Sequence, residues 1–381
     1  MTVNIKPKAK TRKLWLNIHL YLGLIFGLFF VMTGITGSIL AFYVEIDELQ
    51  HPELVIADKP NQQKQSYETV FQALKISEPA RDKAWRLELP DDPNRMITAR
   101  YYKPVETEHL AFEPLMLWVN PYTSEVVSNR FWGDFAMTWI YDLHFTLLMD
   151  VNGRIALSII GMFIFISLCT GLYLWWPSKH VLKTAFTFKR HTSSQRNNYD
   201  IHKLTGIYSL PILVVIVATG ILLGFPPVKP AVKAISPLYS PASTQSTLIA
   251  NGQRLSLDYI VDIAQQQFPT ANVKWIETPD GIMGSYRINL RQQGEPSQRF
   301  PKTNVWLDQY SGKILAVRDV YKDSAGDTFL RWLHPLHSGQ AFGLTGRIIV
   351  CISGLLPIIL FVTGFIRWRQ KQRNKLTQKP Q

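Results

Sequence analysis

Residues 14–44 read LWLNIHLYLGLIFGLFFVMTGITGSILAFYV, a run of 31 residues without a charged side chain. A helix needs about 20 residues to cross the ~30 Å hydrocarbon layer of a membrane, so this run is long enough to span it. It follows a basic N-terminus, as a secretory signal does. However, it is about twice as long as the apolar region of a signal and has no clear small-x-small cleavage site. We therefore expect a retained transmembrane helix.

Three further apolar stretches have the length of a membrane span, and they begin near Ile155, Leu204 and Ile348. The sequence predicts a membrane protein with four transmembrane α-helices and two α+β domains, built as a tandem duplication of helix, domain and helix. The predicted parts are tails at 1–13 and 369–381, membrane helices at 14–44, 154–176, 202–225 and 348–368, outer domains at 45–153 and 226–347, and a loop at 177–201.

The net charge of +13 is concentrated in three short segments. Residues 1–13, 177–201 and 367–381 hold 16 of the 41 Lys and Arg residues but only one of the 28 acids, which leaves 25 cations and 27 acids elsewhere. Basic segments that alternate with membrane helices mark the cytoplasmic side. We therefore expect both termini and the 177–201 loop in the cytoplasm. A nucleic-acid-binding protein would instead carry its cations on one face of a folded domain.

Several kinds of site are excluded by the sequence. Cys169 and Cys351 both fall inside membrane helices at different depths, so neither a disulfide nor a thiolate metal site is expected. No phosphate-binding loop, dinucleotide fingerprint, HExxH or GxSxG motif is present. The cytoplasmic segments are too short to fold into a flavin or nicotinamide domain, so electrons would have to come from a membrane quinol or from a separate cytoplasmic reductase.

The two halves of the chain repeat one another at nearly fixed offsets. His19 precedes Thr36-Gly37 in the first helix, and 183 residues later His202 precedes Thr219-Gly220. Around the second and fourth helices the offset is 193. The matched positions there are Leu143-His144, Gly153-Arg154 and Thr170-Gly171 with Leu336-His337, Gly346-Arg347 and Thr363-Gly364.

Each outer domain has the pattern of a mixed α+β fold. Amphipathic stretches at 66–75 and 256–268 predict helices, and the alternating segments that start at Trp85 and Ser285 predict strands. The Pro-rich stretch at 226–241 is expected to be a connector that leaves the third helix.

The repeat separates four of the nine histidines from the rest. His19 and His202 lie at the cytoplasmic ends of two helices that run in the same direction, so they share a depth in the membrane. His144 and His337 share a depth on the outer side. Two imidazoles at one depth are what a six-coordinate haem needs on its two faces. We therefore predict two b-type haems, one held by each pair of histidines.

Other interpretations of these histidines remain open. A histidine near a membrane interface often serves only as an amphipathic anchor. Zinc or non-haem iron is another option, because His334 and His337 have i, i+3 spacing, but the spans lack carboxylates to complete such a site. We prefer His337 as the outer ligand and keep His334 as the fallback. The remaining histidines have no partner in the repeat and are expected at the surface: His51, His109, His180 and His191.

Glycine placement is consistent with a large flat cofactor. Positions 18 residues apart share a helix face, and His19 with Gly37 and His202 with Gly220 have this spacing. Gly23 and Gly206 follow their histidines by one turn and would clear space around the inner site. Close packing of helices through small residues is the competing explanation. Arg154 and Arg347 lie at the outer helix ends, where they would pair with haem propionates or extend to the membrane interface.

The segment Trp15-x3-His19-x3-Gly23 with Thr36-Gly37, and the Leu-His-x8-Gly-Arg segments at 143–154 and 336–347, resemble the PepSY-associated transmembrane-helix family of iron-regulated bacterial inner-membrane proteins. The resemblance covers essentially the whole chain. One branch looks like the ferric-siderophore reductases, typified by ferrioxamine reductase, which carry two haems.

The resemblance implies a ferric-siderophore reductase of the bacterial inner membrane. Electrons would pass from the cytoplasmic side through the His19/His202 haem to the His144/His337 haem, and then to iron(III) in a periplasmic siderophore, of hydroxamate type. Two alternatives remain: a haem-bearing electron-transfer subunit for a separate enzyme, and a membrane-anchored peptidase-inhibitory or binding module.

Overall fold

The computed structural model describes residues 7–56, 63–110, 112–189, 193–249 and 252–377. The predicted cytoplasmic cations Lys6, Arg190 and Lys379 and the predicted surface residue His191 lie outside these ranges. The chain divides into two compact units: the helical unit, residues 1–42, 141–228 and 333–381, and the sheet unit, residues 43–140 and 229–332.

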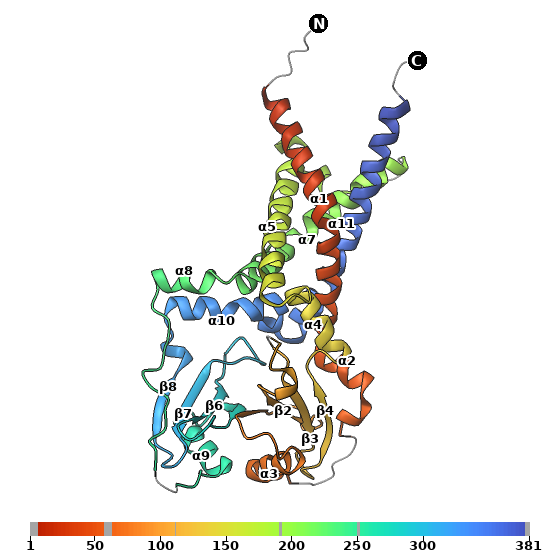
Figure 1. Ribbon diagram of the computed structural model, residues 1–381. Coiled ribbons are helices and arrows are strands. Elements are labelled where there is room, and N and C mark those ends of the chain that lie inside the picture. The colour runs from red at the N-terminus through yellow and green to blue at the C-terminus, as the bar shows by residue number, and fades with distance from the viewer. Residues whose placement is uncertain (1–6, 57–62, 111, 190–192, 250–251, 378–381) are drawn as a thin grey trace. The chain divides into compact units, whose positions relative to one another are not determined.

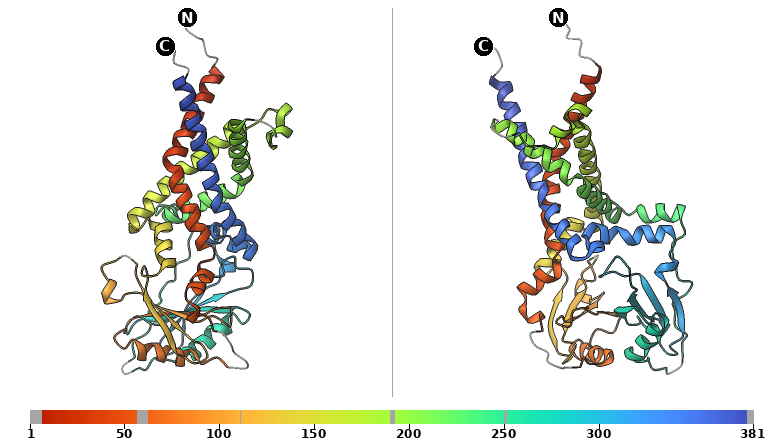
Figure 2. Two further views of the ribbon diagram at one scale, coloured as in Figure 1. Left: turned by 90° about the vertical axis from the view of Figure 1, so that its right-hand side faces the viewer. Right: turned by 180° about the vertical axis from the view of Figure 1, so that it is seen from behind.

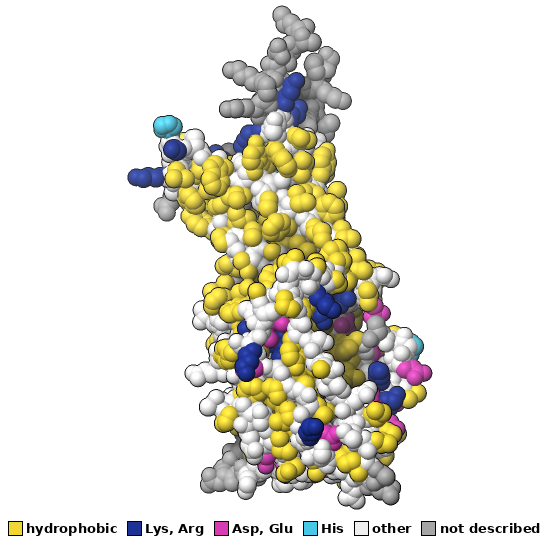
Figure 3. Space-filling view, turned by 90° about the vertical axis from the view of Figure 1, so that its left-hand side faces the viewer, with side chains coloured by type: hydrophobic (Ala, Val, Ile, Leu, Met, Phe, Trp, Pro, Cys, Tyr) yellow, Lys and Arg dark blue, Asp and Glu magenta, His cyan; other side chains and the backbone are white. Residues whose placement is uncertain are grey.

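The helical unit contains four long helices (Figures 1 and 2). They are α1 (Pro7–Leu40), α5 (Asp150–Trp175), α7 (Ser194–Gly224) and α11 (Gly343–Thr377), and each contains a stretch long and apolar enough to cross a membrane. The contacts run in a ring, α1 with α5, α5 with α7, α7 with α11, and α11 with α1. Hydrophobic side chains cover most of the described helical surface on the face that Figure 3 shows, as expected where lipid is the solvent. The predicted four-span membrane fold is confirmed.

Helix α7 begins eight residues before the predicted start of its membrane span. Ser193 caps it, since its hydroxyl accepts a hydrogen bond from the backbone N–H of Arg196 at 3.3 Å. Behind this cap, Asp200 is fully buried and accepts from Arg196 and Lys203. The carboxylate is therefore neutralised by cations of its own helix.

Helices α1 and α11 cross at a point where both have glycine. A Cβ at Gly34 would lie 2.2 Å from the backbone oxygen of Gly354, so neither position has room for a larger side chain. Next to this crossing, the Ser38 hydroxyl donates a 2.7 Å hydrogen bond to the backbone oxygen of Cys351. Close packing of helices through small residues therefore explains Gly34 and Gly354, which are not among the glycines spaced from the repeated histidines.

The chain also contains several shorter helices. They are α2 (Tyr43–Gln50), α4 (Ala136–Thr146), α6 (Leu182–Ala185), α8 (Val228–Ile235) and α10 (Ala325–Ser338). The Pro-rich connector predicted at 226–241 is therefore partly helical. Pro230 lies in the first turn of α8, where a missing backbone N–H costs no intrahelical hydrogen bond.

The two predicted outer domains form a single eight-stranded antiparallel sheet, which corrects the expectation of two separate domains. The strand order is β4-β3-β2-β1-β5-β6-β7-β8. The halves join where β1 pairs with β5, with Leu87 opposite Ile276. The strands are β1 (Trp85–Glu88), β2 (Ile97–Tyr101), β3 (Leu115–Val119), β4 (Val126–Phe131), β5 (Asn272–Glu277), β6 (Ser285–Arg291), β7 (Thr303–Asp308) and β8 (Ile314–Arg318).

Helices α3 (Tyr67–Ser77) and α9 (Leu257–Gln267) cover one face of the sheet. Their N-termini cap each other. The Asp258 carboxylate accepts from the backbone N–H groups of Tyr67 at 2.9 Å and Glu68 at 3.0 Å, and the Glu68 carboxylate accepts from that of Leu257 at 2.9 Å. An acid at a helix N-terminus satisfies unpaired donors and opposes the helix dipole. These hydrogen bonds therefore join the two sequence repeats within the sheet unit.

Candidate functional site

The structure brings His19 and His202 next to each other inside the helical unit, with one ring nearly perpendicular to the other. His19 comes from α1 and His202 from α7, and their ring centroids are 6.2 Å apart with the ring planes at 80°. His144, from α4, lies next to His337, from α10, with ring centroids 6.1 Å apart and ring planes at 49°. We call His19 with His202 the inner pair and His144 with His337 the outer pair. The pairs predicted from the repeat are thus the pairs that meet.

The spacing within each pair suits two imidazoles on one metal ion. With metal–nitrogen bonds of about 2 Å and ring centres about 1 Å beyond each nitrogen, the centroids of two axial imidazoles are about 6 Å apart. Neither pair forms part of a cluster of three or more His, Cys, Asp or Glu among the described residues. Each pair offers two imidazoles, the number of axial ligands that a six-coordinate haem takes from a protein.

His334, the fallback ligand, is not the residue opposite His144. It lies one turn before His337 on α10, and its Nδ1 is buried. Among the unpaired histidines, His109 and His180 are exposed, and His51 is half-buried beside Glu53. The structure therefore separates the four repeated histidines from the others.

Each of the four histidines makes a hydrogen bond through Nδ1 to a residue of a neighbouring helix. In every case a threonine of a Thr-Gly pair lies at hydrogen-bond distance. The contacts are His19 with Thr170 at 3.1 Å, His144 with Thr36 at 2.9 Å, His202 with Thr363 at 2.9 Å, and His337 with Thr219 at 3.2 Å.

These contacts determine which ring nitrogen is free. Nδ1 of His19 also lies 3.0 Å from the backbone oxygen of Ser167, and Nδ1 of His337 lies 2.9 Å from that of Ile216. A carbonyl only accepts, so Nδ1 must carry the proton. The threonines give the same answer, because each donates its hydroxyl proton to a carbonyl of its own helix, as Thr36 does to Met32 at 2.8 Å. Nε2 is therefore unprotonated, as a metal ligand requires.

The glycines of the Thr-Gly pairs make room for the histidine rings. A Cβ at Gly37 or Gly220 would lie 3.0 Å from Cε1 of His144 or His337, and one at Gly171 would lie 3.1 Å from Cε1 of His19. Gly37 and Gly220, whose placement was interpreted as room for a flat cofactor, are therefore in contact with an imidazole ring. Substitution here would push the ligand out of position.

Gly23 and Gly206 differ from these, because they border open space. A Cβ at Gly23 meets nothing within 4 Å, and one at Gly206 meets only Leu360 at 3.7 Å. Both line a cavity of about 300 Å³ that also contains His19 and His202. The cavity wall is mostly apolar, which suits a flat hydrophobic macrocycle.

The cations around the two pairs are arranged differently from the prediction. Arg347 donates from Nε to the backbone oxygen of Ala41 at 2.8 Å and lies over Phe42. Arg154 has a buried Nε without a hydrogen-bond partner in the described part of the chain, so it retains a donor for a carboxylate. The lining of the inner cavity includes four cations, Arg12, Lys203, Arg367 and Lys371, and the guanidinium of Arg367 lies over the ring of Tyr199 at 4.3 Å.

Burial favours the neutral form of His144 and His337. Burial, with a smaller contribution from the neighbouring His337, lowers the pKa of His144 to about 3. Burial also lowers the pKa of His337. Neutral imidazole is the form that binds a metal.

The two histidine pairs, each with the threonines that hold it, lie at two different depths in the helical unit. Along α1, His19 of the inner pair and Thr36, which holds the outer pair, are 17 residues apart, or about 26 Å of helix. That distance is most of the ~30 Å thickness of a hydrocarbon layer. The threonines were missed as functional residues, although their repetition with the histidines was the signal that would have identified them.

Comparison with known protein families identifies a match to nearly the whole chain. The family model described as PepSY-associated TM region matches residues 16–371. No curated protein matches the chain.

Proposed function

The chain belongs to the family of the PepSY-associated TM region, whose members include iron-regulated membrane proteins, and on this premise we propose that it is a dihaem oxidoreductase. In this proposal it passes electrons across the bacterial inner membrane and reduces a ferric siderophore in the periplasm. The observation that carries the proposal is the geometry of the two imidazole pairs, with centroids 6.2 and 6.1 Å apart and Nδ1 protons committed elsewhere.

The haem ligands would be His19 with His202 and His144 with His337. Bound haem supplies reversible one-electron chemistry, with a potential set by its ligands and surroundings. The protein's part is to hold the four Nε2 atoms in place through Nδ1. A hydrogen bond from Nδ1–H raises the basicity of Nε2, which stabilises the oxidised metal.

Two cations are suited to the carboxylates that a haem carries. Arg367 lies in the wall of the inner cavity, with its guanidinium over the Tyr199 ring. Arg154, whose Nε has no hydrogen-bond partner among the described residues, lies over the ring of Phe145, which follows His144 in the sequence. A guanidinium pairs with a carboxylate through charge-assisted hydrogen bonds. In Arg347 the Nε donates to the backbone oxygen of Ala41, so this atom would not pair with a haem carboxylate.

The proposed substrate chemistry balances as one electron per iron. Iron(III) in the chelate gains one electron and becomes iron(II), while the chelating ligand keeps its donor atoms. Iron(II) has less charge and binds hard oxygen ligands more weakly, so reduction releases the metal. The electron donor would be a membrane quinol or a separate cytoplasmic reductase. The basic segments at 1–13, 177–201 and 367–381 support a cytoplasmic location for that end of the bundle.

Rapid mixing tests this function directly. Purified protein, reduced by dithionite and freed of excess reductant, is mixed with a ferric siderophore while the haem absorption is followed. The proposal expects fast reoxidation with formation of iron(II), trapped by a ferrous chelator. A haem protein that stays reduced with every ferric chelate would instead be an electron-transfer subunit for a partner. A chain that binds no haem would leave the anchored binding module as the explanation.

A further inference from the structure

Helix α10 presents an apolar stripe on one of its sides. Phe329, Trp332 and Leu336 follow one another at i, i+3 and i+7, the spacing that places side chains on one face of a helix. Phe329 is 44% exposed, Trp332 is 38% exposed, and Leu336 is half-buried. Single apolar side chains at a surface are ordinary, but a contiguous row of them marks an interaction site.

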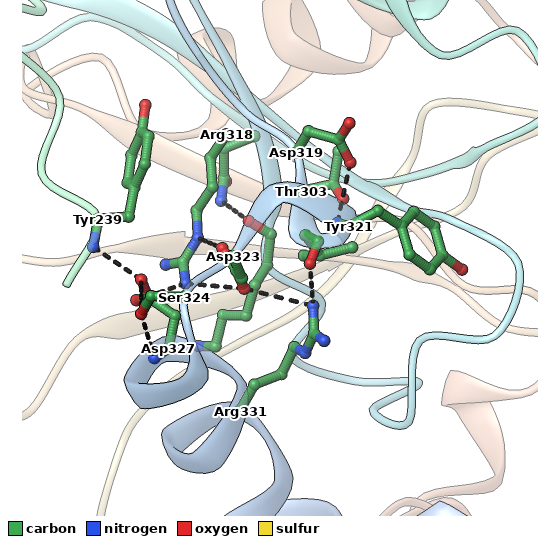
Figure 4. A network of polar contacts seen from close by, with 12 residues as sticks. Tyr239, Thr303, Arg318, Asp319, Tyr321, Asp323, Ser324, Asp327 and Arg331 are labelled. Carbon is green, nitrogen blue, oxygen red and sulfur yellow. Dashed lines mark hydrogen bonds and ion pairs between the residues drawn. The ribbon is translucent and has the colours of Figure 1, made fainter. Parts of the chain in front are cut away.

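Charged side chains fix the other side of α10 to the sheet. Figure 4 shows Arg318 of β8 held between Asp323 at 3.1 Å and Asp327 at 2.9 Å. Arg331 also contacts Asp323, at 3.3 Å. At 100° per residue, the side of α10 that carries Asp327 and Arg331 lies roughly 150° around the helix from the apolar stripe. The ion pairs therefore hold α10 with its stripe turned away from the sheet.

Helix α8 lies beside α10, runs in the opposite direction and extends the apolar surface (Figures 1 and 2). The two helices touch through Val232 and Gly326, since a Cβ at Gly326 would lie 3.0 Å from the Val232 side chain. Three residues after each contact position comes an exposed apolar side chain, Ile235 in α8, which is 87% exposed, and Phe329 in α10. In antiparallel helices of the same hand, these two positions lie on the same side of the pair. Lys233, which is exposed, lies on the other side of α8.

The first sequence repeat carries a matching stripe on α4. Ala136, Trp139 and Leu143 stand 193 residues before the three positions of the α10 stripe. Trp139 is 48% exposed, whereas its neighbour Thr138 is fully buried, so α4 also has one covered and one open side. Tryptophan is enriched where a protein passes from lipid to water, because its ring is apolar and its N–H is polar. Exposed tryptophans at the same position of both repeats therefore suit a membrane interface.

The course of the chain indicates what covers this surface. Helix α8 begins four residues after Gly224, where α7 ends, and α10 ends five residues before α11 begins at Gly343. Connections of this length reach at most about 18 Å. Both helices therefore adjoin the ends of membrane-spanning helices, and lipid is the surrounding medium there.

We propose that Trp139, Ile235, Phe329 and Trp332 form an interfacial surface, which inserts into the phospholipid leaflet at that end of the spans. Interfacial helices bury an apolar face among the lipid headgroups and upper acyl chains and keep their charges in water. Helix α8 has this division, with Ile235 on one side and Lys233 on the other. The surface adds a second mode of membrane contact to the four spans and does not depend on the proposed function.

Nitroxide labels test the interfacial surface in the full-length chain, reconstituted into phospholipid bilayers. Ile235→Cys, Phe329→Cys and the control Lys233→Cys are each made with Cys169→Ser and Cys351→Ser, which remove the two native cysteines. Collisions of the label are measured with oxygen, which concentrates in lipid, and with a water-soluble nickel chelate. The ratio of oxygen to nickel collisions should be several-fold higher at positions 235 and 329 than at 233, two residues from Ile235 on the same helix.

Trp139→Cys extends the test to the first repeat and should give the high ratio of Phe329→Cys. Since the labelled positions are exposed, each variant should melt at the temperature of the cysteine-free parent. Ratios as low as that of Lys233→Cys would place the surface in water and overturn the inference. Protection from both collision partners, with spin–spin broadening between labels, would indicate contact between two copies of the chain and would overturn it too. Haem takes no part in these measurements, so their outcome is separate from that of the haem proposal.

Discussion

Replacing Thr36 by valine isolates the role of the threonines that hold the histidines. The change keeps the shape of the side chain and removes the oxygen that lies 2.9 Å from Nδ1 of His144. Thr33, one turn earlier on the same helix, is a matched control. Its hydroxyl donates to the backbone oxygens of Phe29 and Phe30, and no histidine contact of that hydroxyl is seen in the described part of the chain.

The size of the effect follows from what His144 loses. The ring of His144 also has a hydrogen bond with the backbone of Thr33, so the change removes one of two partners, a net loss of about 0.5–1.5 kcal/mol. Mutation of a group that orients a metal ligand typically weakens metal binding about 10- to 100-fold, which corresponds to about 1.4–2.7 kcal/mol. Thr36→Val should therefore lower the affinity for the outer haem by this factor and raise its reduction potential, because Nε2 becomes less basic. Thr33→Val should match wild type in both respects.

The assay combines haem content per chain with a redox titration that resolves the two haems. Occupancy is measured while haem is removed by a competing apoprotein, so that a tenfold change in affinity becomes visible. If Thr36→Val and Thr33→Val gave the same haem retention and the same potentials, the assignment of Thr36 as the acceptor for a haem ligand would be refuted.

Three further substitutions test the helical unit. Gly23→Leu meets no protein atom near its Cβ but fills the inner cavity, so the chain should fold and lose the inner haem, which haem content would show. Gly34→Ala places a methyl 2.2 Å from the Gly354 oxygen, so the free energy of unfolding should fall by about 1–3 kcal/mol, seen as a lower melting temperature. Arg367→Gln removes a cation from the inner cavity and should lower the inner potential, whereas Arg369→Gln, two residues away and exposed, should leave it unchanged.

The helical unit was largely predictable because its signals are local or repeated. Apolar runs of sufficient length predicted the four spans, and the offset of 183 residues was enough to pair His19 with His202. The role of Thr36 was not predictable, since it depends on α4 returning to α1 across more than 100 residues. Arg367 was missed for another reason, because its position has no matching cation in the first half of the sequence repeat.

In the sheet unit, individual strands could be predicted from the sequence, but their pairing could not. Alternating residues indicated strands at Trp85 and Ser285, and both are strands. The pairing of β1 with β5 joins residues almost 190 positions apart, as Leu87 and Ile276 show, and no local pattern encodes such a contact. The ion pairs of Glu277 depend on the same pairing, because it brings Arg86 of the first repeat and Arg287 of the second to one carboxylate. Both features follow from the tertiary fold.

The central claim is that two pairs of imidazoles each hold a haem, and haem stoichiometry tests it most directly. Wild type, His19→Ala and His337→Ala are expressed with ample haem and compared by reduced-minus-oxidised spectra and quantitative haem extraction. We expect two low-spin haems in wild type, with sharp α and β bands on reduction, and one in each variant. Wild-type chains that contain no haem, or variants that retain both, would contradict the account.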